Sequence, residues 1–321
     1  MDLEQQREEE AIGQPIIILV GPTAIGKTEL ALTVAETFGC EIVGVDSVQI
    51  YRFMDIGTAK PTDLERGRVP HHLIDYILPD EEYSATRFVA DCQDAIQQIQ
   101  KNGKIPLLVG GTGLYFSALE KGIFVMPEIP PDIRHKIKED LHTLGRDVLW
   151  QELTRCDPNT SNRIHPNDTY RLLRALEIVR STGVPWSEFI ARHQQQQQTK
   201  AKVAKIGLAR DRNELYARIE QRVGNMVNTG LLKEVEKLLA LGYPKTLHSM
   251  QSLGYRHIHN YLDGEWTWGK SIELLVRDTR RYAKRQLTWF RADQEITWFH
   301  PKQVKEIITA VSAYLTGLKN N

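Results

Sequence analysis

The most constraining feature of this chain is a short apolar run followed at once by a glycine-rich loop. Residues 16–20 read IIILV, residues 21–28 read GPTAIGKT, and apolar residues then recur at helical spacing up to Phe38. An apolar run of this length is typical of a strand buried in a parallel sheet. The loop matches the pattern G-x-x-x-x-G-K-[ST], in which a strand–loop–helix unit cradles phosphates with backbone N–H groups. The sequence therefore predicts a phosphate-binding loop at the centre of an α/β fold.

Each part of this loop has a chemical role in binding linked phosphates. Gly21 and Gly26 let the backbone curl so that N–H groups point inward, and the following helix adds the partial positive charge of its N-terminus. Lys27 supplies a full positive charge, and the Thr28 hydroxyl is the candidate ligand for Mg²⁺, the cofactor that we expect. The predicted diphosphate-binding residues are Gly21, Pro22, Thr23, Ala24, Ile25, Gly26, Lys27 and Thr28.

Two further apolar runs indicate how the loop is placed in a sheet. Residues 41–45 are followed by Asp46. Residues 105–109 are followed by the sequence GGTG, which contains Thr112. Strands that alternate with helices predict a doubly wound parallel sheet, in which ligands bind outside the carboxyl ends of the strands. The loop, Asp46 and Thr112 all follow such ends, so we expect them to meet at one site.

The sequence pattern changes after residue 125. Three prolines are followed there by a helical pattern, which ends in a run of five glutamines. We expect an α/β, P-loop NTPase-like core from residues 15–125 and 204–321, with a helical C-terminal part. Residues 126–203 are expected to form a helical insertion domain. The acidic residues 1–14 are expected to form a flexible tail.

Charge is distributed unevenly along a chain that is neutral overall. Residues 1–125 carry 10 Lys and Arg against 19 Asp and Glu, residues 126–203 carry 12 against 10, and residues 204–321 carry 19 against 12. A polyanion would therefore bind the C-terminal two thirds, although charge alone leaves random scatter equally open. One predicted helix carries five cationic side chains and only one carboxylate among them. Such a cluster can bind RNA phosphates. These cations are Arg277, Arg280, Arg281, Lys284 and Arg285.

Cysteine usage and hydropathy indicate the compartment. The three cysteines are far apart and form no paired pattern, which favours a reducing compartment and argues against disulfides or zinc. No apolar run approaches the roughly 18 residues that cross a bilayer, and the acidic start does not resemble a targeting signal. We therefore expect a cytoplasmic protein with no membrane partner. We also expect a monomer.

A phosphate loop does not by itself identify the phosphate compound. Kinases and ATPases usually carry an apolar strand that ends in an Asp for magnesium, and the only match here is IVGVD, which ends at Asp46. Asp46 is therefore either a metal ligand or a base that faces whatever lies beside the phosphates. The residues considered so far leave both open.

The residues after Asp46 resemble one family closely. The segments that carry the resemblance are GPTAIGKT, DSVQIYRFMDIGTAKP (46–61), HHLID (71–75), GGTGLY (110–115), RALE (174–177), R-x-x-Q-R-x-x-x-M (218–226), GYR (254–256) and RRYAKRQLTWFR (280–291). In this order they resemble the tRNA dimethylallyltransferases, the tRNA isopentenyltransferase family, over nearly the whole chain. Several of the strings are long and peculiar to that family.

The resemblance implies transfer of a dimethylallyl group from dimethylallyl diphosphate to N6 of adenosine-37, immediately 3′ of the tRNA anticodon. The products are N6-(dimethylallyl)adenosine and pyrophosphate. Asp46 matches the family's general base, and a carboxylate in reach of the amine can take its proton. Thr23 and Arg218 match residues that attend the reacting diphosphate, where fixed charges stabilise the leaving group. Arg222, one helical turn from Arg218, could face the same site.

The resemblance also implies which residues bind the tRNA anticodon stem-loop. The target adenine must leave its stack and enter a pocket, lined here by Asp46, Ser47, Val48 and Gln49. The other residues at positions where the family contacts tRNA are Thr112, Arg134, Tyr170, Arg171, Arg174, Gln251, Ser252, Leu253, Gly254, Tyr255 and Arg256. Many members have Gln in place of Tyr170, and stacking could replace a hydrogen bond there.

Three other functions are compatible with parts of the sequence. An adenylate isopentenyltransferase would use the same core on free AMP or ATP, but a free nucleotide needs no helical insertion and no long cationic surface. A P-loop small-molecule kinase or ATPase would explain the loop alone. A non-catalytic RNA-binding protein does not explain Asp46 beside an intact P-loop.

Overall fold

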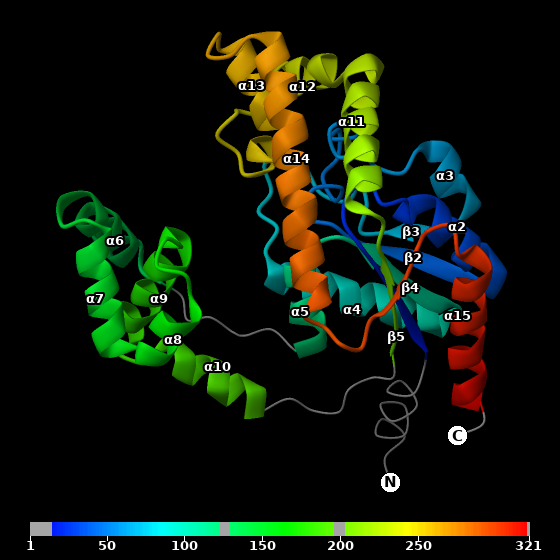
Figure 1. Ribbon diagram of the computed structural model, residues 1–321, viewed down its shortest axis with the longest axis horizontal. Helices are drawn as coiled ribbons and strands as arrows, with labels where there is room; N and C mark the ends of the chain where they lie inside the picture. The colour runs from blue at the N-terminus through cyan, green and yellow to red at the C-terminus, as the bar shows by residue number, and fades with distance from the viewer. Residues whose placement is uncertain (1–14, 122–128, 196–202, 320–321) are drawn as a thin grey trace. The chain divides into compact units, whose positions relative to one another are not determined.

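The computed structural model describes residues 15–121, 129–195 and 203–319 (Figure 1). The tail expected at residues 1–14 lies outside this range. The strands of the described chain form one six-stranded sheet in the order β3-β2-β4-β1-β5-β6, and every pairing is parallel. The strands are β1 (Ile16–Val20), β2 (Cys40–Val45), β3 (His71–His72), β4 (Ile105–Gly110), β5 (Val203–Leu208) and β6 (Thr297–Phe299).

Helices occupy the crossovers that parallel strands require. They are α2 (Lys27–Phe38), α3 (Asp63–Arg68), α4 (Ala85–Lys101), α5 (Gly113–Lys121), α6 (Pro131–Thr143), α7 (Arg146–Cys156), α8 (Pro158–Arg163), α9 (Thr169–Thr182), α10 (Trp186–Gln195), α11 (Arg212–Thr229), α12 (Leu231–Ala240), α13 (Tyr255–Leu262), α14 (Trp268–Arg291) and α15 (Val304–Lys319), with a short 3₁₀ helix, Ser249–Gln251. The predicted α/β fold with a parallel sheet is confirmed.

The sheet is buried because its strands are apolar on both faces. Ile17 and Leu19 of β1 pack in one cluster with apolar residues of α2, α11 and α15. Their neighbour Ile18 points to the opposite face, where α4 contacts β2 and β4. Burial on both faces explains why the strands read as continuous apolar runs instead of alternating ones.

Two strands escaped the sequence analysis because neither is a clean apolar run. β5 reads VAKIGL, and the ammonium of its partly buried Lys205 pairs with Asp293 and Glu295, each 2.8 Å away. β6 has three residues, which is too short for a periodicity. The carboxylates that neutralise Lys205 come from the segment that leads into β6, so the tertiary structure makes both strands possible.

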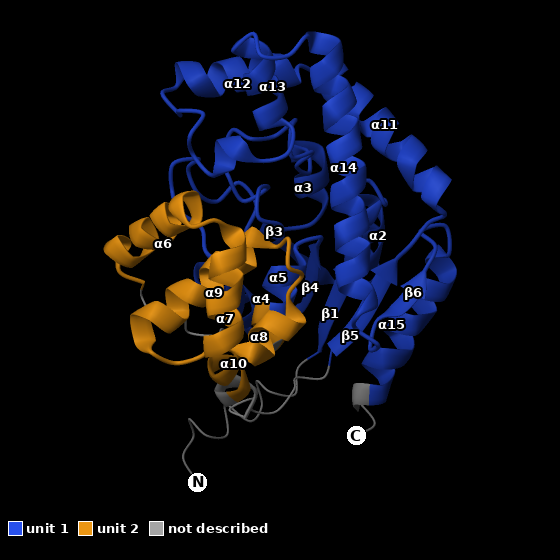
Figure 2. Ribbon diagram, turned by 60° about the vertical axis from the view of Figure 1, so that its left-hand side comes forward, with its two compact units in different colours: residues 1–117, 200–321 blue, residues 118–199 orange. Residues whose placement is uncertain are grey.

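The chain divides into two compact units (Figure 2). Unit 1 comprises residues 1–117 and 200–321, and unit 2 comprises residues 118–199, where the sequence places a helical insertion at 126–203. Helices α6 to α10 of unit 2 surround their own apolar core, which includes Leu149, Leu153 and Leu172. No helix in the described parts of the chain has the length and apolar character that a bilayer crossing requires.

A glycine divides the first long helical segment of the C-terminal part. Apolar residues recur at helical spacing through residues 214–241, but these residues form two helices, α11 and α12, separated at Gly230. Gly230 has φ of 106°, a left-handed conformation that glycine adopts without steric cost and that ends a helix. The break lets α11 and α12 run in different directions, as Figure 1 shows.

Candidate active site

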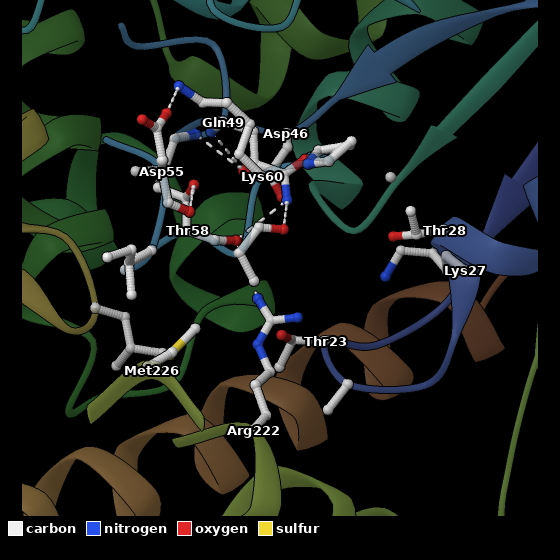
Figure 3. A pocket seen from close by; sticks show the side chains of 18 of the residues that line it. Thr23, Lys27, Thr28, Asp46, Gln49, Asp55, Thr58, Lys60, Arg222 and Met226 are labelled. Atoms are coloured by element: carbon white, nitrogen blue, oxygen red, sulfur yellow. Dashed lines mark hydrogen bonds and ion pairs between the residues drawn. The ribbon is translucent and has the colours of Figure 1, made fainter. Parts of the chain in front are cut away.

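The carboxyl ends of the central strands open into a cleft of about 1310 Å³. The loop after β1 supplies residues 23–28, the segment after β2 supplies residues 46–49, and Gly110 ends β4 beside them. Residues of α11, of α14 and of the 55–61 loop complete the lining. Figure 3 shows side chains of the phosphate loop, of the segment after β2, of the 55–61 loop and of α11 around the cleft. The structure thus brings together the strand ends that the sequence singled out.

The phosphate loop has the backbone that its glycines allow. Gly26 has φ of 107°, a left-handed value that disfavours a residue with a Cβ, and α2 begins at the next residue. The Lys27 ammonium donates to the carbonyl oxygens of Gly21 and Pro22, 2.9 Å from each. Burial lowers the pKa of Lys27 to about 7, because the nearby charge of Asp46 only partly offsets the lost hydration. Thr28 lines the cleft and makes no side-chain hydrogen bond to the described residues.

Two arginines from beyond β5 hold the outer side of this loop. Arg218 Nε donates to the Ala24 carbonyl at 2.8 Å, and Arg210 Nε donates to the Ile25 carbonyl at 3.0 Å. Both guanidinium groups reach Gly26, where a Cβ would lie 3.8 Å from Arg218 Nη2 and 3.6 Å from Arg210 Nη2. Arg218 is therefore at the phosphate loop, as its predicted role requires.

Asp46 is fixed by one oxygen and open at the other. Its Oδ1 accepts hydrogen bonds from the backbone N–H groups of Val48 at 2.9 Å and Gln49 at 3.2 Å, a local turn typical of Asp. No hydrogen bond from the described residues reaches Oδ2. Asp46 carries enough charge into the cleft to oppose the lowering of the pKa values of Lys27 and Arg222. Such a carboxylate can accept a proton without losing its orientation.

The other predicted adenine-pocket residues form a hydrogen-bonded floor. Ser47 N–H donates to Thr112 Oγ1 at 3.2 Å, which ties the segment after β2 to the loop after β4. Gln49 Nε2 donates to the carbonyls of Thr58 and Ala59, 3.1 Å from each. The amide nitrogen of Gln49 therefore holds the 55–61 loop, and its carbonyl oxygen is the atom left to read a base edge.

Arg222 and Tyr282 add two polar groups that face Asp46. Arg222 Nη2 donates to the Thr58 carbonyl at 3.0 Å, and burial lowers the pKa of its guanidinium while Asp46 opposes that shift. Burial and the charge of Asp46 raise the pKa of Tyr282, so this phenol stays protonated as a donor. The helical-turn spacing had indicated Arg222. Tyr282 lies in the family-like string at residues 280–291, but the sequence analysis assigned it no role.

The 55–61 loop is held by two charged residues that the site prediction missed. The Lys60 ammonium is 2.7 Å from the Tyr51 carbonyl, 2.6 Å from Asp55 Oδ1 and 2.9 Å from Asp75 Oδ1. Glu234 of α12 accepts hydrogen bonds from the backbone N–H groups of residues 55, 56 and 57 at 2.9, 2.7 and 2.9 Å. Lys60 lies in the segment 46–61, which resembles the family, so the sequence could have indicated it. Glu234 lies in none of the segments that resemble the family, and no sequence pattern indicated it.

The predicted tRNA segment at residues 251–256 is only partly at the surface. Its cleft-lining residues include Gln251 and Arg256, and Arg256 pairs with Asp278 at 3.1 Å. Tyr255 is fully buried and donates its hydroxyl hydrogen to Glu234 Oε1 at 2.6 Å. Its ring lies 2.5 Å from where a Cβ of Gly57 would be, so Tyr255 anchors the 55–61 loop and offers RNA no side-chain surface. Ser252 and Leu253 also line the cleft, and Gly254 is buried.

The remaining predicted tRNA residues belong to unit 2. Arg134 is exposed on α6, and Tyr170 on α9 has 79% of its surface accessible. Arg171 pairs with Asp168 at 3.1 Å, and Arg174 pairs with Glu177 at 2.7 Å. Tyr170 is a large aromatic residue exposed at the first turn of a helix, which is a suitable platform for stacking on a base.

The basic helix α14 carries less free charge than its sequence indicates. Arg277 and Arg281 share Asp278, at 3.0 and 3.5 Å. Arg280 pairs with Glu220 of α11 and lies over the ring of Tyr216. Within the described chain, Lys284 is exposed without an ion pair and Arg285 lines the cleft. The second carboxylate, Glu220, is distant in sequence, so only the fold revealed it.

Comparison with known proteins decides the family. A family model described as IPP transferase matches residues 49–293. A tRNA dimethylallyltransferase from Desulfotalea psychrophila is 46% identical, over 95% of this chain and 97% of its own length. The chain belongs to the tRNA dimethylallyltransferase family. A second relative, the tRNA dimethylallyltransferase 2 of Geotalea uraniireducens, is 50% identical over 88% of this chain and 91% of its own.

Solved structures agree with this assignment to the tRNA dimethylallyltransferases. A tRNA isopentenylpyrophosphate transferase from Bacillus halodurans matches with a TM-score of 0.70 and 38% identity, over 96% of this chain and 98% of its own. A eukaryotic dimethylallyltransferase acting on tRNA matches with a TM-score of 0.73 and 29% identity, over 89% of this chain and 74% of its own. The resemblance seen in the sequence is therefore confirmed, and the chain is an enzyme of the prenyltransferase class.

Proposed function

We propose that this enzyme transfers a dimethylallyl group from dimethylallyl diphosphate to N6 of adenosine-37 in tRNA and releases pyrophosphate. One observation carries the proposal: the phosphate loop after β1 and Asp46 after β2 line the same cleft, at the ends of the two strands that flank β4. A kinase would need phosphates and a metal-bound acceptor here. A carboxylate beside a phosphate-binding loop is equally compatible with an attacking amine, from which it would take a proton. Family membership favours the amine reaction over a kinase reaction.

The leaving-group side is built from the phosphate loop and its cations. The first N–H groups of α2 have no partner within the helix and point toward the loop's concave side. Lys27 and Arg218 are already held at this loop by its carbonyl groups. As the bond between the allyl carbon and the diphosphate oxygen breaks, negative charge builds on the leaving pyrophosphate. Groups fixed in advance stabilise that charge without reorganising.

The nucleophile side is built around Asp46. The exocyclic amine of adenine is a weak nucleophile because its lone pair is delocalised into the ring. When N6 forms its bond to the allyl carbon it must lose a proton, and Oδ2 of Asp46 is the acceptor in place. Because Val48 and Gln49 hold Oδ1, the carboxylate keeps its orientation during that transfer.

A magnesium ion fits the residues present at the phosphate loop. Mg²⁺ is usually held by one or two protein oxygens together with phosphates and waters. The Thr28 hydroxyl lines the cleft and has no hydrogen-bond partner in the described chain, so it suits this role. When bound, the ion would neutralise part of the diphosphate charge.

The size of the cleft favours tRNA over a free nucleotide. Sites for small molecules commonly have volumes of about 300–1,000 Å³, and this cleft is larger, at about 1310 Å³. Enzymes that modify a base flip it out of its stack, so the site must also admit neighbouring nucleotides. Gln251 and Arg256 line the cleft and are exposed, so they are placed for such contacts.

The test is product analysis with defined substrates. The purified protein is incubated with unmodified tRNA, Mg²⁺ and dimethylallyl diphosphate, and the digested nucleosides are analysed by mass spectrometry. We expect N6-(dimethylallyl)adenosine in the tRNA. Prenylated AMP with unmodified tRNA would establish the adenylate alternative, and ATP hydrolysis without prenyl transfer would establish the kinase or ATPase alternative.

Replacing Asp46 by Asn tests its proposed role as the base. Asparagine keeps an oxygen that can accept from Val48 and Gln49 but cannot take the proton. We expect turnover to fall by about 10²–10⁴-fold while tRNA affinity stays close to that of the parent. Equal losses in turnover and affinity would contradict a role in proton transfer.

A further inference from the structure

Gln286 of α14 joins the loops that follow two neighbouring strands. Its Oε1 accepts a hydrogen bond from the Thr23 N–H at 2.8 Å, and its Nε2 donates to the Gly111 carbonyl at 2.8 Å. Thr23 follows β1 and Gly111 follows β4, and these strands pair directly. Gln286 is 6% exposed, which limits competition from water for its bonds.

A carboxamide satisfies both partners at once. A backbone N–H is solely a donor and a carbonyl is solely an acceptor, so the bridging side chain must present one acceptor and one donor, and a carboxamide carries both at its end. These partners also fix which end of the amide is oxygen. A glutamate would turn a second acceptor toward the Gly111 carbonyl, and a methionine of similar length would satisfy neither group.

The close approach of Gln286 accounts for the glycine at position 111. A Cβ at Gly111 would lie 2.2 Å from Gln286 Nε2 and 3.4 Å from the Gly21 carbonyl oxygen. No ordinary side chain tolerates the first distance, so any larger residue must displace the amide of Gln286. The contact can therefore be broken from either side.

The positions of Thr23 and of Asp46, both of which are proposed to act in the reaction, depend on this bridge. Because Gln286 occupies the Thr23 N–H, the donor that Thr23 can offer a diphosphate is its hydroxyl, which has no partner among the described residues. On the other side, Gly111 precedes Thr112, whose Oγ1 accepts from the Ser47 N–H next to Asp46. One side chain thus connects the leaving-group loop to the segment that carries the base.

We propose that Gln286 is a positioning residue that sets the spacing between the diphosphate loop and Asp46 for prenyl transfer. The inference rests on the proposed function. Displacing a reacting group by about 1 Å can lower a rate about 100-fold, because the attacking and leaving atoms no longer align. Both ends of the Gln286 amide are bonded to protein loops, so we expect its loss to change the rate of the chemical step more than the binding of tRNA.

The test is a double-mutant cycle with Gln286→Met and Gly111→Ala. Single-turnover rates are measured with saturating tRNA and saturating dimethylallyl diphosphate, and are expressed per mole of folded protein. The Kd for tRNA and the Tm are measured for each variant as well. We expect each variant to lower the rate, by about 100-fold for Gln286→Met, with a tRNA Kd like that of the parent. The double variant should match Gln286→Met within about twofold, because both changes break one contact. Ser271→Ala, fully buried on the same helix, is the control that should keep the parent rate.

Gln286→Glu adds a readout that a packing role would not move. Protonation of the buried carboxyl restores a donor toward the Gly111 carbonyl, so the rate relative to the parent should recover as pH falls from about 8 to 6. A parent-like rate in Gln286→Met, or additive losses in the cycle, would overturn the inference while leaving the proposed function intact. Absence of prenyl transfer by the parent would instead refute the proposed function.

Discussion

Glu234→Gln is the substitution whose effect follows most directly from the contacts. The Glu234 carboxylate accepts four hydrogen bonds, three from the backbone N–H groups of residues 55–57 and one from the Tyr255 hydroxyl, at 2.6 to 2.9 Å. A glutamine has one acceptor oxygen in place of two and turns an N–H₂ group toward donors. The substitution therefore removes the charge and at least two of the four bonds.

The cost can be estimated from these bonds. A hydrogen bond to a charged group contributes about 1.5–3 kcal/mol, and a donor left without a partner costs about 1–3 kcal/mol. Water can reach the exposed N–H of Asp55 more easily than the others, so we expect a loss of about 3 kcal/mol in the free energy of unfolding. For a unit of this size that loss corresponds to a fall in Tm of about 6–12 °C.

The assay combines thermal unfolding with hydrogen exchange of the amides at residues 55–57, which should lose protection. Tyr255→Phe removes one bond and should cost about 2 kcal/mol. Glu236→Gln, an exposed position on the same helix, is the matched control and should stay within about 0.5 kcal/mol of the parent. If Glu234→Gln and Glu236→Gln unfold alike and residues 55–57 keep their protection, the loop is not held by this carboxylate.

Three further predictions concern the binding of diphosphate, tRNA and Mg²⁺. Because the pKa of Lys27 is lowered to about 7, its amine is mostly neutral at pH 8. A bound diphosphate raises that pKa, so diphosphate binding should take up a proton and should weaken as pH rises above 7. Calorimetry in two buffers measures the proton uptake, which Lys27→Met should abolish. Lys284→Ala should reduce the slope of log Kd for tRNA against log salt by about 1, whereas Lys305→Ala on α15 should leave it unchanged. Thr28→Ala should raise the Mg²⁺ concentration for half-maximal turnover about tenfold, with recovery in Thr28→Ser and no change in tRNA affinity; an unaltered Mg²⁺ requirement would exclude Thr28 as the ligand.

The sequence by itself determined the phosphate loop, the strand ends and the family. A strand, a loop and a helix that are consecutive in the chain interact locally, so the residues of GPTAIGKT are sufficient to specify their arrangement. Asp46 was also found, because parallel strands bring their carboxyl ends to one edge and the position after each strand can be read from the sequence. Strings such as DSVQIYR identified the family in the same way, since they are contiguous.

The tertiary structure alone decided which distant residues hold these groups in place. Glu234 meets the 55–61 loop, Gln286 meets Thr23, and Glu220 neutralises Arg280, over sequence separations of 177, 263 and 60 residues. A carboxylate or amide on a helix has the same local pattern whether it is solvated or bonded to a loop. Its partner is set by how the helices pack on the sheet, and this packing depends on apolar contacts along the whole chain, which no short segment records.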